Sequence, residues 1–162
     1  MNQDLKNAKI LIVDDLESNI DILWGLLEME GYTNVRGNTD SRKVVDLVKT
    51  FEPDLILLDL MMPHLSGYEV MELLKAERRN SLDSTGYLPI LVLTADITPE
   101  AKIKALKGGA KDFVSKPFDL TEVSLRIKNL LETQYLYQLL RTKKEDMEGK
   151  IIDFLKGNDE WY

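Results

Sequence analysis

Residues 56–67, ILLDLMMPHLSG, place one acid, Asp59, among apolar residues, and the run then breaks at Pro63 and Gly67. Moving a charge into apolar surroundings is costly, so an acid at the end of a core strand needs a compensating role. A second stretch, ILIVDDLES at 10–18, ends another apolar run with Asp14 and Asp15. The two patterns together predict that the three acids share one site.

The composition limits the classes of protein to which the chain can belong. Its 162 residues suit one domain with a short appendage, or one larger domain. A net charge of -7 does not favour a nucleic-acid surface, so no direct contact with nucleic acid is expected. Because the chain has no cysteine, disulfides and thiolate metal sites are excluded, and a reducing cytoplasm fits.

Neither secretion nor membrane insertion is expected from the sequence. The opening residues, MNQDLKNAK, lack the apolar core of a signal peptide, and no apolar run approaches the length of a membrane span. The single histidine, His64, excludes a multi-histidine metal site, and we expect it to be an exposed loop residue.

Apolar runs and helical periodicity alternate along the chain. Short apolar runs predict strands at 9–13, 33–36, 54–58, 89–94 and 112–115. Periodic apolar positions predict helices at 18–30, 41–51, 68–78 and 100–106, and a long one from Asp119. A polar loop, RRNSLDSTGY, covers 78–87. Five strands alternating with five helices predict an α/β fold, a doubly wound parallel sheet with helices on both faces.

Polar residues follow the predicted strands at the edge where ligands bind in open parallel sheets. These residues are Asp14, Asp15, Asp59, Thr94, Ser115 and Lys116. Taken singly, each has a simpler explanation, such as a helix cap, a strand-end hydroxyl or a solvated lysine. Their coincidence favours chemistry, because clustered carboxylates attract Mg²⁺ and a carboxylate can form an aspartyl phosphate. Lys116 would add positive charge, and Thr94 could donate a hydrogen bond to a phosphoryl oxygen.

Four segments, LIVDD, LILLDLMMPHLSG, ILVLTA and FVSKPF, occur in order, and with them the chain resembles a response-regulator receiver domain of two-component signalling. The resemblance covers about 8–129 and implies a (βα)5, flavodoxin-like fold. It implies that Asp59 is the phosphoacceptor. It also implies that Asp14, Asp15, Asp59 and the backbone carbonyl of Met61 hold Mg²⁺.

The same resemblance implies a set of switch residues. Thr94 would be the switch hydroxyl, with the small Ala95 beside it, and Lys116 would contact the phosphoryl group. A cis peptide bond is expected before Pro117. Phe113 stands at the switch aromatic, where many members have Tyr. Since Phe has no hydroxyl, only a change of ring rotamer is left to it.

The implied function is a phosphorylation-controlled switch, not an enzyme acting on a separate substrate. A sensor histidine kinase or phosphotransfer protein would phosphorylate Asp59, and the face of the fourth helix, fifth strand and fifth helix would respond. An alternative is a Mg²⁺-dependent phosphohydrolase. It is disfavoured because Met61 and Leu16 stand where a second acid is needed, and no insertion could cap a substrate.

Two further classes of protein fit these motifs less well. A dinucleotide-binding domain lacks support because no G-x-G-x-x-G follows the first strand. A scaffold that never takes phosphate would not need the complete set of acids, Thr94 and Lys116.

The receiver-like part is predicted to span 1–129, and 130–162 form a helical extension. No Pro or Gly lies between 120 and 148, so the last helix should pass Asn129 unbroken. Apolar residues recur at Leu136, Leu139, Leu140, Met147, Ile151 and Phe154. Lys143, Lys144 and Gly149 interrupt them, which disfavours a long coiled coil. The extension is therefore either a solvated linker or a signalling helix that forms a homodimer or leads to an output module.

Overall fold

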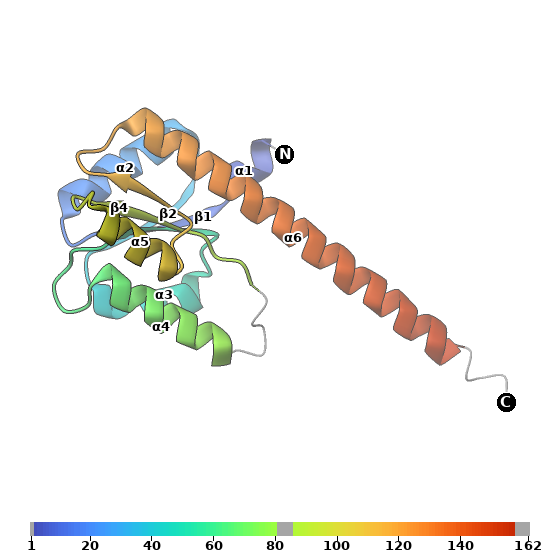
Figure 1. The fold of residues 1–162 in the computed structure, drawn as a ribbon. Helices are drawn as coiled ribbons and strands as arrows, with labels where there is room; N and C mark the ends of the chain where they lie inside the picture. Colours follow the sequence, from blue (N-terminus) through green and yellow to red (C-terminus); the bar gives the residue numbers. More distant parts are fainter. Residues whose placement is uncertain (1, 81–85, 158–162) are drawn as a thin grey trace.

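A computed structural model describes residues 2–80 and 86–157 of the chain. An α/β domain carries one long helix that projects away from it (Figure 1). The strands form one parallel sheet in the order β2-β1-β3-β4-β5. Their bounds are β1 (Lys9–Val13), β2 (Asn34–Asn38), β3 (Leu55–Asp59), β4 (Ile90–Thr94) and β5 (Asp112–Ser115). The predicted doubly wound, flavodoxin-like fold is confirmed.

Helices cover both faces of this sheet. They are α1 (Asn2–Lys6), α2 (Glu17–Met29), α3 (Val44–Phe51), α4 (Gly67–Asn80), α5 (Pro99–Lys107) and α6 (Leu120–Gly157), with a 3-10 turn at Ser41–Lys43. Buried residues of α2 and α6 share one core cluster, and those of α3, α4 and α5 share the other. The sheet is therefore the middle of three layers.

The central strands β1, β3 and β4 are apolar except at one end residue each, because both of their faces are covered. Ile10 and Ile12 of β1 point into the α2–α6 core, whereas Leu11 and Val13 point into the other core. Every residue of β3 is buried. Each buried aliphatic side chain contributes roughly 1.5–3 kcal/mol through the hydrophobic effect, so these strands anchor the domain.

Three elements differ from the sequence-based expectations. Strand β2 runs to Asn38, two residues past the predicted end, because it pairs with β1 as far as Val13. The predicted helix at 41–51 begins as the 3-10 turn. Helix α1 was not expected from its polar sequence, and its Leu5 is buried in the core. The part of the predicted polar loop at 81–85, like residues 158–162, lies outside the described residues.

Helix α6 continues unbroken from Leu120 to Gly157, so the prediction that it passes Asn129 is confirmed. Val123, Ile127 and Leu131 are buried against the domain, and Gln134 is the last buried residue of the helix. The helix stays in contact with the domain at least as far as Gln138, which donates a hydrogen bond to Asp54, and then projects. Within 2–80 and 86–157, no helix combines the length and the apolar character that a membrane span requires.

Candidate functional site

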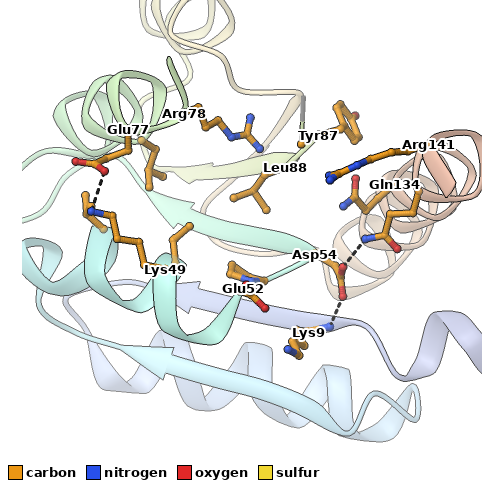
Figure 2. Close-up of a pocket in the computed structure, with 16 residues that line it drawn as sticks. Lys9, Lys49, Glu52, Asp54, Glu77, Arg78, Tyr87, Leu88, Gln134 and Arg141 are labelled. Atoms are coloured by element: carbon orange, nitrogen blue, oxygen red, sulfur yellow. Dashed lines mark hydrogen bonds and ion pairs between the residues drawn. The ribbon is translucent and has the colours of Figure 1, made fainter. Parts of the chain in front are cut away.

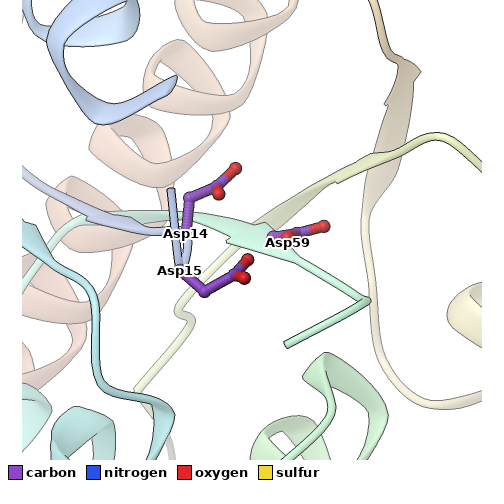
Figure 3. A group of neighbouring side chains, drawn as sticks. All are labelled: Asp14, Asp15 and Asp59. Carbon is purple, nitrogen blue, oxygen red and sulfur yellow. The ribbon is translucent and has the colours of Figure 1, made fainter. Parts of the chain in front are cut away.

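The sheet topology brings Asp14, Asp15 and Asp59 to one place. Strands β1 and β3 are neighbours, and the chain turns to β2 on one side of β1 and to β3 on the other. A crevice forms at such a reversal, beyond the carboxyl ends of the strands. One carboxylate oxygen from each acid lies within 4.8 Å of the other two (Figure 3).

Asp14 is fully buried, and its carboxylate is held from three sides. Oδ1 accepts a hydrogen bond from the backbone N–H of Leu16 at 2.9 Å. Oδ2 accepts from Nδ2 of Asn19 at 3.1 Å and from Nζ of Lys116 at 2.7 Å. Asn19 was not predicted as a site residue. Its only sequence signal is an amide in the first turn of the helix that follows the acidic pair.

Asp59 ends β3 and is only 3% exposed. Its Oδ1 lies 3.3 Å from Nζ of Lys116 and also accepts a hydrogen bond from the backbone N–H of Met61. The side chain of Met61 itself faces solvent. Lys116 therefore bridges two buried carboxylates, Asp14 and Asp59. The strand it follows, β5, is separated from β3 by one strand and from β1 by two.

The loop after Asp59 folds back tightly against β3. The backbone N–H of Gly67 donates to the carbonyl of Leu60 at 2.9 Å. A Cβ atom on Gly67 would overlap the carbonyl oxygen of Asp59 and lie 2.8 Å from Cα of Leu60. The absence of a side chain at Gly67 thus allows α4 to begin directly beneath the acid. His64 lies in this loop and is exposed, as predicted.

The charges at this site do not balance. Three carboxylates face one ammonium group, that of Lys116. Burial raises the pKa of Asp59 to about 6, the nearby charge of Asp14 acts in the same direction, and Lys116 opposes both. An all-oxygen donor set with residual negative charge fits a hard divalent cation, so these three acids could hold a metal ion.

Thr94, buried at the end of β4, lies one residue beyond Leu93, the register partner of Asp59. Its Oγ1 accepts a hydrogen bond from the backbone N–H of Asp96 at 3.0 Å, which leaves its own hydroxyl proton free to be donated. Its carbonyl accepts from the backbone N–H of Lys116, and this bond fixes the loop that carries the lysine.

The remaining predicted residues surround this strand end. Phe113 on β5 is half-buried, and Nζ of Lys102 lies 4.6 Å from the centre of its ring. Ala95 is exposed. The peptide bond between Lys116 and Pro117 is cis, as expected.

Comparisons with known proteins agree with this arrangement. The family model described as the response regulator receiver domain matches residues 10–128. The alkaline phosphatase synthesis transcriptional regulatory protein PhoP of Bacillus subtilis is 36% identical over 90% of this chain and 58% of its own length. The DNA-binding dual master transcriptional regulator RpaA of Synechocystis is 38% identical over 76% of this chain and 48% of its own length.

Solved structures show the same likeness. The receiver domain of the Francisella response regulator 1452 superposes with a TM-score of 0.65 at 28% identity, covering 78% of this chain and 98% of that one. The chain spans about half the length of the curated relatives it matches. It belongs to the response regulator receiver domain family of two-component signalling.

Proposed function

We propose that this domain accepts a phosphoryl group on Asp59 from a histidine kinase or a phosphotransfer protein, in a reaction that depends on Mg²⁺. The observation that carries the proposal is the pairing of Lys116 with both Asp14 and Asp59 beside a third acid, Asp15. A purely structural acid cluster would not need one ammonium group aimed at two buried carboxylates.

In the proposed reaction, an Asp59 carboxylate oxygen attacks phosphorus, and the P–N bond to the donor histidine breaks with its electron pair staying on nitrogen. Lys116 then balances the charge on the acyl phosphate, and the hydroxyl of Thr94 donates to a phosphoryl oxygen. Asp14, Asp15, Asp59 and the backbone carbonyl of Met61 would hold Mg²⁺, which supplies charge neutralisation during transfer. Water later hydrolyses the acyl phosphate.

The output of the switch is a shift between two conformations. Thr94 moving toward the phosphoryl group would pull on the loop to α5 and open space beside Phe113. The surface formed by α5, β5 and α6 would then change shape, and partners that bind one shape better would read the change. The half-buried ring of Phe113, capped by Lys102, is the side chain on β5 best placed to move.

A small-molecule phosphodonor with Mg²⁺ tests the acceptor. We expect intact mass to show one added phosphoryl group on the wild type and none on Asp59→Asn. The matched control is Asp96→Asn, an exposed acid near the same sheet edge, which should be labelled like the wild type. Labelling of Asp59→Asn at the wild-type rate would exclude Asp59 as the acceptor.

The metal proposal has its own test. Asp14→Ala removes one of the three clustered carboxylates, so calorimetry should show weaker Mg²⁺ binding than in the wild type. An unchanged affinity would mean that Mg²⁺ binds elsewhere.

A further inference from the structure

A second cavity lies at the opposite edge of the sheet from Asp59. It holds about 630 Å³ and opens where α6 leaves the domain, between the amino ends of β1 and β3, helices α3 and α4, and α6 itself (Figure 2). We call it the basal cavity. Its lining includes Val48, Leu74, Arg78, Leu88, Gln134 and Arg141.

Gln134 brings an unused hydrogen-bond acceptor to this cavity. The residue is only 6% exposed, and its Oε1 accepts no hydrogen bond from any of the described residues. Buried polar atoms are normally satisfied, so this acceptor marks a place where a hydrogen-bond donor, from water or from a ligand, would be favourable. Gln138, one turn further along α6, does have a partner, because its Nε2 donates a hydrogen bond to Oδ1 of Asp54 at 2.9 Å.

Arg78 brings an uncompensated positive charge to the same cavity. It is half-buried on α4, and no carboxylate within 2–80 and 86–157 pairs with it. Burial lowers the pKa of its guanidinium group.

Two of the three acids that line the cavity already have partners. Glu77 is bound by Lys49 at 2.8 Å, and both oxygens of Asp54 accept hydrogen bonds, one from the backbone of Lys9 and one from Gln138. Arg141 reaches over the cavity from α6, opposite Arg78 (Figure 2). Arg141 is itself paired with Glu145 at 2.9 Å, and the third lining acid, Glu52, follows α3. Arg78 is therefore the lining cation on which an anion would lie.

The floor between these polar groups is apolar, formed by Val48, Leu74 and Leu88. We propose that the basal cavity binds a small organic anion, an acidic group on an apolar body that also carries an N–H or O–H donor. The acidic group would lie on Arg78 and the apolar body would cover the floor. The donor would reach Oε1 of Gln134 once the amide turns toward the cavity, because this atom is shielded from solvent in the free chain. Because Gln134 belongs to α6 and Arg78 to α4, such a ligand would tie the projecting helix to the domain.

This proposal is independent of phosphorylation at Asp59, because the two sites lie at opposite ends of the strands. Lys9 starts β1, which ends directly before Asp14, and Asp54 directly precedes β3, which ends at Asp59. Both sites could be occupied at once, and a failure of either proposal would leave the other standing.

The test uses 8-anilinonaphthalene-1-sulfonate, which has an anionic group, an aromatic body and one N–H. Titrated into the full chain, it should bind about tenfold more tightly than N-phenyl-1-naphthylamine, the same body without the sulfonate. Arg78→Gln should remove that preference, whereas Arg79→Gln, the exposed neighbour outside the cavity, should keep it. Equal affinity for the two probes, or equal effects of the two variants, would overturn the anion site.

Gln134→Leu separates a ligand-binding role from a purely structural one. It removes the unpartnered acceptor, so the free protein should melt at a higher temperature while the sulfonate probe binds several-fold more weakly. Probe affinity equal to that of the wild type would overturn the assigned role of Gln134. A cooperative melting transition and a circular dichroism spectrum like that of the wild type verify that each variant is folded.

Competition identifies the class of ligand. 10-Hydroxydecanoate, which carries the O–H donor, should displace the probe at a lower concentration than decanoate, which lacks it, and inorganic phosphate at the same concentration should not displace it. Displacement by inorganic phosphate alone would reduce the cavity to a general anion site and contradict the need for an apolar body.

Discussion

At the residue scale, the buried carboxyl group of Asp59 couples folding to pH. Its pKa in the folded chain, about 6, lies above the unfolded value of 3.8. The folded state therefore binds the proton more tightly, so the group favours folding at low pH, and this contribution is lost as the pH rises through about 6. Without divalent cations, Asp59→Asn should stabilise the chain more at about pH 8 than at about pH 5, by on the order of 1 kcal/mol.

Thermal melting at the two pH values measures this difference. Asp96 provides the control, because hydrogen bonds from Thr98 lower the pKa of its carboxyl group below the tested window. The effect of Asp96→Asn should therefore be the same at both pH values. A pH-independent effect of Asp59→Asn would show that its carboxyl group is not held at a raised pKa.

Lys116 should matter for the switch more than for metal binding. Its ammonium contacts Asp14 and Asp59, so in Lys116→Ala Mg²⁺ should still bind but phosphorylation should no longer be transmitted. Amide exchange around Thr94 and Phe113, with and without a phosphoryl mimic, would show the loss. Lys107→Ala, an exposed lysine on α5, should respond like the wild type. If Lys116→Ala responds in the same way, the lysine is only structural.

Most residues of the candidate site could be predicted from the sequence, because parallel strands end at the same edge of the sheet and the residue that follows each strand can be identified from the end of its apolar run. Asp14, Asp59, Thr94 and Lys116 were all found in this way. Asn19 and Gln134 were not, since each is distinguished only by what faces it in the folded chain: a buried carboxylate in one case, and no partner in the other.

At the element scale, the start of α4 depends on the absence of a side chain at Gly67. Gly67→Ala would force its Cβ against the backbone of Asp59 and Leu60, so we expect a loss of roughly 2 kcal/mol in stability and slower phosphorylation of Asp59. Gly25→Ala, in the middle of α2 with nothing within 4 Å, should instead stabilise the chain by up to about 1 kcal/mol.

Chemical denaturation and the phosphodonor assay measure the two effects. If both glycine variants changed stability in the same direction, the close approach of Gly67 to β3 would not limit the loop.

The strands show which elements can be predicted from local sequence. The predicted bounds of strands β1, β3 and β4 lie within one residue of the observed bounds, because the apolar runs of these strands are bounded by charged residues or Pro89. Strand β2 was cut short at Arg36, since Gly37 and Asn38 have little strand propensity. Their place in the sheet comes from pairing with Ile12 and Val13, and Ile20 of α2 packs where a side chain on Gly37 would lie.

At the scale of the whole molecule, α6 has two apolar sides with different roles. Residues advance about 100° each around a helix, so Val123, Ile127, Leu131 and Gln134 fall on the side that packs on the domain. A second set, which we call the tail stripe, falls within about 60° on the opposite side. The tail stripe consists of Leu136, Leu140, Met147, Ile151 and Phe154, each between 54% and 69% exposed.

The tail stripe is the basis for proposing that the chain forms a homodimer. A contiguous exposed apolar surface usually marks a contact with another chain. Pairing along it would leave the basal cavity open, because the cavity lies on the domain-facing side of α6. It would also place the contact on the helix that borders the switch surface, which gives phosphorylation a route to alter the dimer. Lys143, within the stripe, breaks the strict repeat of a long coiled coil.

Two adjacent isoleucines allow a sharp test of this dimer. Removing the residues after Asn129 would also remove the buried Leu131, so substitutions are preferable to truncation. In sedimentation, the full chain should be dimeric, at least when phosphorylated, and Leu140→Glu and Ile151→Glu should shift it to monomer. Ile152→Glu makes the same change about 100° around the helix, off the stripe, and should leave the dimer intact. A wild-type monomer in both phosphorylation states, or equal effects of the two isoleucine variants, would rule out the tail stripe as the interface.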